Sequence, residues 1–276
     1  MTKPTPLRPD RPDPSEASDD EPQDYRDCKR KSRHKGIYLL PNLFTTGALF
    51  AGFYAIIAAI KGDFEIAAIA VFVAMLLDGL DGRVARLTNT QSAFGAEYDS
   101  LSDMASFGLA PALVMYQWSL IHLAELGTFW GKLGWLAAFI YAASAALRLA
   151  RFNTQIGIAD KRYFQGLPSP AAAAVVVGAV WVSETYQISG QDLMFPALLL
   201  TTATGLLMVS RFSFYSFKDL DLKQRVPFIA VLVMVLIFVL LSLETATVLF
   251  AIFFLYGLSG PVLALFRWLR RKRRLS

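Results

Sequence analysis

The sequence has few of the residues that form disulfides or bind soft metals. It contains one cysteine, Cys28, and two histidines, His34 and His122, among 276 residues. A single cysteine excludes an intramolecular disulfide, which fits a position on the cytoplasmic side of a membrane. Because the two histidines lie far apart in the chain, the sequence does not indicate a histidine-based zinc site.

Charged residues are also scarce. They make up 18% of the chain, whereas hydrophobic residues make up 55%, and the mean hydropathy is +0.43. Apolar runs of roughly 18 residues or more recur, and each is long enough to cross a bilayer core as a helix. These runs lack the period-two alternation of β-barrel strands, the other architecture that satisfies the backbone in lipid. The sequence therefore predicts an all-α, polytopic membrane protein.

We predict about eight transmembrane helices. The expected spans are 38–60, 64–87, 99–121, 131–153, 168–186, 192–210, 226–243 and 246–266. An even number of spans places both termini on one side, and Lys and Arg accumulate on cytoplasmic flanks. Basic residues cluster on the side of the termini, while the other side receives only Lys61 and Lys132. Both termini are therefore expected in the cytoplasm.

The segments outside the spans differ in composition. Residues 1–24 contain six prolines and seven acidic residues, so we expect a disordered tail. Residues 25–36 form a basic juxtamembrane segment, which serves as a topology anchor or binds anionic lipid. Residues 37–266 form the transmembrane domain, and residues 267–276 form a basic cytoplasmic tail.

Four aspartates, Asp78, Asp81, Asp99 and Asp103, fall at the cytoplasmic ends of the second and third spans. Acids inside a membrane are rare and usually line a cavity, pair with a cation or bind metal. The i,i+3 and i,i+4 spacings keep each pair on one helical face. In an antiparallel hairpin, Asp81 is level with Asp99, and Asp78 is level with Asp103 one turn deeper. The sequence thus predicts four carboxylates around one small volume.

Such a cluster requires compensating positive charge. Oxygen ligands alone suit Mg²⁺, Mn²⁺ or Ca²⁺, and two such ions can clamp a phosphoryl group during displacement. Gly82 and Gly95 leave room for a ligand beside the backbone, and Arg86 offers hydrogen-bond donors to phosphate. Alternatively, Arg86 anchors its helix at the interface and the glycines only pack helices.

Eight fixed positions follow the pattern D-x₂-D-G-x₂-A-R-x₈-G-x₃-D-x₃-D. They are Asp78, Asp81, Gly82, Ala85, Arg86, Gly95, Asp99 and Asp103. This pattern resembles the signature of the CDP-alcohol phosphatidyltransferases, membrane enzymes that move a phosphatidyl group from a cytidine-diphosphate lipid to an alcohol. The resemblance implies that the four aspartates bind two divalent ions and that Asp103 also takes the proton of the acceptor hydroxyl. It also implies a homodimer.

The same resemblance implies which residues contact CDP-diacylglycerol. They are Asn42, Thr45, Gly82, Arg86, Ser92 and Gly95. Asn42 and Thr45 belong to the segment LLPNLFTT at the start of the first span. Alternatively, these two polar residues cap the helix and bond back to its own carbonyls.

Three further segments resemble the bacterial phosphatidylserine synthases of this family: RLARFN (148–153), GLPSPAAAA (166–174) and YSFKDL (215–220). They imply that L-serine is the acceptor and that phosphatidylserine and CMP are the products. A guanidinium can hold the serine carboxylate through two hydrogen bonds, and Arg148 and Arg151 are the candidates. Arg151 is equally explained as an interfacial anchor.

The sequence leaves two alternatives open. In the first, the chemistry is the same but the acceptor is glycerol 3-phosphate, inositol phosphate or choline. In the second, the acids belong to an ion-coupled transporter. No inverted repeat of the acidic hairpin occurs in residues 168–276, which argues against a transporter. The expected setting is a bacterial inner membrane with the site facing the cytoplasm and no nucleic-acid partner. The aromatic residues Phe212, Phe214, Tyr215 and Phe217 are predicted to form an interfacial belt.

Overall fold

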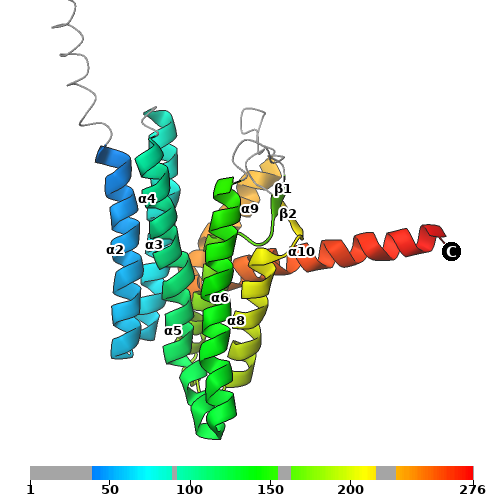
Figure 1. The fold of residues 1–276 in the computed structure, drawn as a ribbon. Coiled ribbons are helices and arrows are strands. Elements are labelled where there is room, and N and C mark those ends of the chain that lie inside the picture. Colours follow the sequence, from blue (N-terminus) through cyan, green and yellow to red (C-terminus); the bar gives the residue numbers. More distant parts are fainter. Residues whose placement is uncertain (1–38, 89–91, 155–162, 216–227, 276) are drawn as a thin grey trace, which may run out of the picture.

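The computed structural model describes residues 39–88, 92–154, 163–215 and 228–275 (Figure 1). The predicted disordered tail, 1–24, and the basic segment, 25–36, lie outside these ranges. So do the connections 155–162 and 216–227.

Helices occupy all eight ranges in which the sequence predicts spans. They are α2 (Leu39–Lys61), α3 (Phe64–Leu87), α4 (Ala93–Asp103), the π-helix η1 (Met104–Leu109), α5 (Ala110–Trp118), the 3₁₀-helix η2 (Leu120–Leu126), α6 (Thr128–Thr154), α7 (Ser169–Thr185), α8 (Met194–Val209), α9 (Phe228–Leu243) and α10 (Thr245–Leu275). The third predicted span is not one helix, because η1 separates α4 from α5. The expected tail at 267–276 continues α10 as far as Leu275.

Length and hydropathy allow three helices of the described residues to cross a membrane: Pro41–Lys61, Thr128–Thr154 and Thr245–Ala264. A fourth crossing results if Ala93–Trp118 and Leu120–Leu126, which are bent by 42°, form one span. The protein is thus helical with three or four candidate membrane spans, and the count of eight remains a prediction.

The helices α2, α3, α4, α6 and α8 run side by side (Figure 1). The start of α2, the end of α3, the start of α4 and a small sheet lie at one end of this bundle. The sheet consists of two antiparallel strands, β1 (Tyr163–Gln165) and β2 (Ser213–Tyr215). The C-terminal part of α10 extends away from the other helices.

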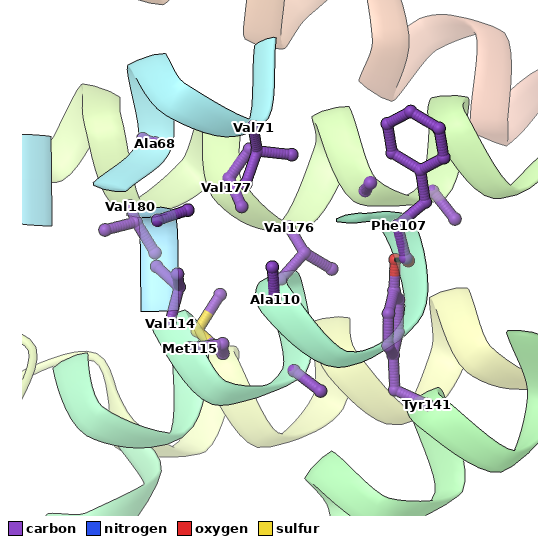
Figure 2. Close-up of a cluster of buried hydrophobic side chains, with 14 of the residues drawn as sticks. Ala68, Val71, Phe107, Ala110, Val114, Met115, Tyr141, Val176, Val177 and Val180 are labelled. Atoms are coloured by element: carbon purple, nitrogen blue, oxygen red, sulfur yellow. Dashed lines mark hydrogen bonds between the residues drawn. The ribbon is translucent and has the colours of Figure 1, made fainter. Parts of the chain in front are cut away.

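Helix α7 lies in the centre of the core. Its Val176, Val177 and Val180 lie between two other helices (Figure 2). On one side they pack against Ala68 and Val71 of α3, and on the other side against α5. Small Ala and Val side chains let the helices approach closely, which favours packing inside a membrane. The helix begins at Ser169 between Pro168 and Pro170, and proline fits the first turn of a helix.

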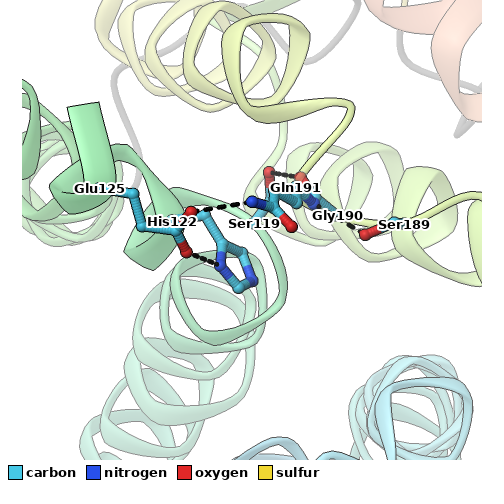
Figure 3. A network of polar contacts seen from close by, with 6 residues as sticks. All are labelled: Ser119, His122, Glu125, Ser189, Gly190 and Gln191. Atoms are coloured by element: carbon cyan, nitrogen blue, oxygen red, sulfur yellow. Dashed lines mark hydrogen bonds and ion pairs between the residues drawn. The ribbon is translucent and has the colours of Figure 1, made fainter.

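A polar network ties the other end of the bundle together (Figure 3). The Ser119 hydroxyl donates to the carbonyl of Gly190 at 2.6 Å, which joins the end of α5 to the turn before α8. In η2, the Glu125 carboxylate contacts His122 Nδ1 at 2.9 Å and accepts a hydrogen bond from Gln191 at 2.8 Å. His122 therefore has a structural partner at this end of the bundle.

The prediction of an interfacial aromatic belt is wrong for Phe214. This side chain is completely buried, and its ring centroid lies 5.7 Å from that of Tyr256 in α10. Gly260 permits this packing, since a Cβ there would lie 2.4 Å from Phe214 Cζ. The hydropathy of the segment could not show that β2 carries this ring into the core.

Candidate active site and metal centre

The structure brings three of the four predicted aspartates together. Asp78 from α3 and Asp99 and Asp103 from α4 each place a carboxylate oxygen within 4.8 Å of the others. Asp99 and Asp103 lie one turn apart on the same face of α4, while Asp78 reaches them from the preceding helix. All three are half-buried. We call Asp78, Asp99 and Asp103 the acid cluster.

The acid cluster has the chemistry of a site for a hard divalent cation. Two of its buried oxygens, Asp99 Oδ1 and Asp103 Oδ1, have no hydrogen-bond partner among the described residues. Buried polar atoms are normally paired, so unpaired buried carboxylate oxygens favour binding of a positively charged ligand. Oxygen ligands without sulfur or imidazole suit Mg²⁺ or Mn²⁺. The residues present therefore fit the metal that the sequence predicts.

The fourth aspartate, Asp81, is turned toward α2. It is buried, and its Oδ2 accepts a hydrogen bond from Thr45 Oγ1 at 2.7 Å. Thr45 Oγ1 also lies 3.2 Å from the Pro41 carbonyl, but its single proton can serve one acceptor, and the shorter distance favours Asp81. Asp81 still interacts electrostatically with Asp78 and Asp99. The predicted group of four is thus three clustered carboxylates with Asp81 beside them.

The other residues predicted to contact the cytidine-diphosphate lipid lie near one end of the bundle. A Cβ at Gly82 would meet nothing within 4 Å, so the backbone of α3 is open there. Arg86 is exposed, and its Nε donates to the Gly82 carbonyl at 2.8 Å. Ser92 caps α4 by accepting from the Gly95 amide at 3.0 Å. A Cβ at Gly95 would lie 3.5 Å from Asn42 Oδ1, which places Asn42 against the start of α4.

The two predicted acceptor-binding arginines have different surroundings. Arg148 Nη1 donates to Ser169 Oγ at 2.8 Å, whereas Arg148 Nε is buried and has no hydrogen-bond partner among the described residues. Arg148 also interacts electrostatically with Asp103. Arg151, one turn farther along α6, donates to the side chain of Gln165 in β1. Arg148 is therefore the arginine beside the acid cluster.

Sequence reasoning missed the π-helix that follows Asp103 directly. Ser106 of the π-helix donates to the Ala48 carbonyl at 3.0 Å, and Ser102 in the last turn of α4 donates to the Thr45 carbonyl at 3.1 Å, so both hydroxyls attach this part of the chain to α2. The Tyr141 hydroxyl donates to the Phe107 carbonyl at 3.1 Å from α6. π-Helices often occur at functional sites. The paired serines, four residues apart, are the only sequence signal we find for this attachment.

Comparison with known proteins agrees with the site. The profile of the CDP-alcohol phosphatidyltransferase family matches residues 38–209, which include the acid cluster and Arg148. The CDP-diacylglycerol–serine O-phosphatidyltransferase of Helicobacter pylori is 36% identical over 222 residues, which are 80% of this chain and 90% of that protein. Proteins of the same name from Mycobacterium tuberculosis and Methanocaldococcus jannaschii are 36% identical over 191 residues and 39% identical over 140 residues. These matches cover 66% and 51% of this chain and 62% and 59% of the respective relatives. Because the profile spans more than half of the sequence and includes the residues of the site, the chain belongs to the CDP-alcohol phosphatidyltransferase family.

Proposed function

We propose that this chain transfers the phosphatidyl group of CDP-diacylglycerol to the hydroxyl of L-serine, with phosphatidylserine and CMP as products. The observation that carries the proposal is the acid cluster beside Arg148, which joins a cation site to a carboxylate-binding group. The names of the relatives support serine as the acceptor.

Asp78, Asp99 and Asp103 would hold the divalent cations, which we propose to be two Mg²⁺ or Mn²⁺ ions, with Asp81 as a further ligand. Ions bound there would neutralise the diphosphate and polarise the phosphoryl group. Arg86 would bind the diphosphate as well, because a guanidinium matches the geometry of phosphate oxygens. The remaining contacts with the nucleotide would come from Asn42, Thr45, Gly82, Ser92 and Gly95.

Asp103 would act as the general base. Its carboxylate takes the proton of the serine hydroxyl as that oxygen attacks the phosphorus that carries diacylglycerol. A new phosphorus–oxygen bond forms to serine, and the bond between phosphorus and the oxygen of CMP breaks. A positioned base lowers the barrier because the hydroxyl loses its proton as it attacks. The reaction needs no covalent intermediate on the protein.

The serine carboxylate would bind Arg148 and, at the edge of the site, Arg151. Arg148 of α6 interacts electrostatically with Asp103, so a carboxylate bound to Arg148 would leave the serine hydroxyl near the base. A guanidinium binds a carboxylate by paired hydrogen bonds, which also selects the orientation of serine.

We further propose a homodimer in the bacterial inner membrane, with eight spans per chain. The acid cluster would face the cytoplasm, where CDP-diacylglycerol can enter from the inner leaflet. Helices at all eight predicted ranges support this arrangement. So does the grouping of the start of α2, the end of α3, the start of α4 and the β1–β2 sheet at one end of the bundle (Figure 1).

The test is CMP release by the purified protein in detergent. It is incubated with CDP-diacylglycerol, Mg²⁺ or Mn²⁺, and either L-serine, glycerol 3-phosphate, inositol phosphate or choline. We expect CMP only with L-serine, and none after chelation of the metal. Release with another acceptor alone would contradict serine but keep the transferase chemistry. Exchange of a solute across vesicles without CMP release would favour a transporter instead.

A further inference from the structure

Ser169 is a buried polar residue at the first position of α7, and the reaction proposed above leaves it without a role. The residue is 1% exposed, and its hydroxyl accepts the hydrogen bond from Arg148 Nη1 at 2.8 Å. In the described residues, this is the one side-chain hydrogen bond between α6 and α7. Ser169 thus links the proposed acceptor-binding arginine to a second helix.

The backbone before Ser169 is held in place. Gly166 has φ +82°, and a Cβ there would lie 2.1 Å from the Met208 carbonyl, so only glycine fits. The amides of Gly166 and Leu167 donate to the carbonyls of Phe212 and Leu207 at 2.9 and 3.0 Å. Pro168 then fixes the entry into α7. The hydroxyl of Ser169 therefore has a defined position from which to orient Arg148.

Because Nη1 of Arg148 is hydrogen-bonded to Ser169, the other two nitrogens of the guanidinium remain available to bind a ligand. Nε and Nη2 form one edge of the planar group, and this edge can bind a carboxylate by two parallel hydrogen bonds. Nε belongs to that edge and is buried without a hydrogen-bond partner among the described residues. A buried donor without a partner is destabilising, so this edge is suited to an anionic ligand.

We propose that Ser169 is a positioning residue that sets acceptor specificity. By holding Nη1, it turns the Nε edge of Arg148 toward the carboxylate of the acceptor, beside Asp103. The site would thereby select hydroxyl compounds that carry a carboxylate. This inference rests on the proposed function, because it assumes a carboxylate-bearing acceptor.

The experiment compares L-serine with serinol, in which a hydroxymethyl group replaces the carboxylate. In Ser169→Ala, we expect the KM for L-serine to rise about tenfold, as for the loss of one hydrogen bond to a charged group. The kcat and the KM for CDP-diacylglycerol should change little. The preference for L-serine over serinol, measured as the ratio of the two kcat/KM values, should therefore also fall about tenfold. Ser169→Thr, which keeps the hydroxyl, should restore the preference.

Two further variants separate positioning from folding. Ser183→Ala removes another buried hydroxyl from α7, one that donates within its own helix to Ala179, and should keep the preference of the wild type. Arg148→Lys keeps the charge but removes the planar edge, and should lower the preference at least as much as Ser169→Ala. Thermal unfolding is measured for every variant.

An unchanged preference in a folded Ser169→Ala protein would overturn the inference. Equal losses with L-serine and serinol would overturn it as well, because they would show a general structural role. Wild-type protein that releases no CMP with L-serine would instead overturn the proposed function, and this result is visible before any variant is compared.

Discussion

Asp103 combines two properties within the acid cluster: it contributes a carboxylate to the three-residue group, and it interacts with Arg148. Asn at this position keeps the size of the side chain but cannot take a proton from a hydroxyl. We expect Asp103→Asn to lower kcat by about 10²–10⁴, the usual contribution of a general base, while fold and CDP-lipid binding are largely spared. CMP release and thermal unfolding measure the two effects. Asp192→Asn, an exposed acid before α8, is the control, and substantial residual activity in Asp103→Asn would refute the base assignment.

Thr45 supports the site through Asp81. Its hydroxyl is buried and donates to the Asp81 carboxylate at 2.7 Å, so it orients a proposed metal ligand. Partners of metal ligands typically change metal affinity by about 10–100-fold when removed. We expect Thr45→Val to raise the Mn²⁺ concentration for half-maximal CMP release by about that factor. Thr45→Ser keeps the hydroxyl and should behave like the wild type. If Thr45→Val needed the same Mn²⁺ concentration as the wild type, this result would count against the role of Thr45.

The sequence was sufficient to find the acids but not their partners. Asp78, Asp99 and Asp103 stand out because charges are rare in apolar helices. The contacts of Thr45 with Asp81 and of Arg148 with Ser169 join residues on different helices, 36 and 21 positions apart. Whether such residues meet depends on how the two helices are rotated relative to each other. Hydrophobic periodicity indicates which face of a helix is buried, but it does not indicate which helix packs against that face.

At the scale of elements, the same reasoning located the helices but not the irregularities between them. Runs of apolar residues predicted all eight helical ranges. The π-helix Met104–Leu109 was not predictable, because it depends on contacts from α2 and α6 rather than on its own composition. The β1–β2 sheet was missed for a similar reason, since its strands of three residues each lie 50 positions apart along the chain.

The attachment of the π-helix to α2 depends on Gly52. A Cβ there would lie 2.4 Å from Ser106 Oγ and 2.7 Å from Ser106 Cα, so the two helices would have to separate. We expect Gly52→Ala to destabilise the fold by about 1–3 kcal/mol, as overpacked cores do, and to lower CMP release by shifting Asp103. Thermal unfolding in detergent measures the first effect.

The matched control for Gly52 is Gly257→Ala in α10. The nearest heavy atom to a Cβ at Gly257 is Val175 Cγ2 at 3.9 Å, an ordinary contact. This substitution should leave stability unchanged or raise it slightly, because alanine favours a helix. If both variants were equally stable, the close approach of α2 to the π-helix would not be needed.

At the scale of the whole molecule, the exposed surface is strongly apolar. Large side chains such as Phe50 of α2, Phe139 of α6 and Leu236 of α9 are 69%, 60% and 56% exposed. Extended apolar surfaces of this kind indicate contact with lipid or with another protein chain. The bilayer would therefore cover most of this surface, and a second copy could cover part of it. The position of each loop relative to the membrane then decides whether substrates reach the acid cluster from the cytoplasm.

The proposed topology predicts which loops can be labelled from outside the cell. In a Cys28→Ser background, single cysteines are placed at three exposed positions: Thr88 after α3, Gln187 after α7 and Glu244 before α10. With eight spans and cytoplasmic termini, positions 187 and 244 lie outside and position 88 lies inside. We therefore expect a membrane-impermeant maleimide to label 187 and 244 in intact spheroplasts, and 88 only after permeabilisation. Labelling of 88 before permeabilisation would place the α3–α4 turn, and with it the acid cluster, toward the outer face. Labelling of 187 but not of 244 would show that the proposed topology is wrong for α9 and α10 alone. These two helices lie beyond the part of the chain that the family profile matches.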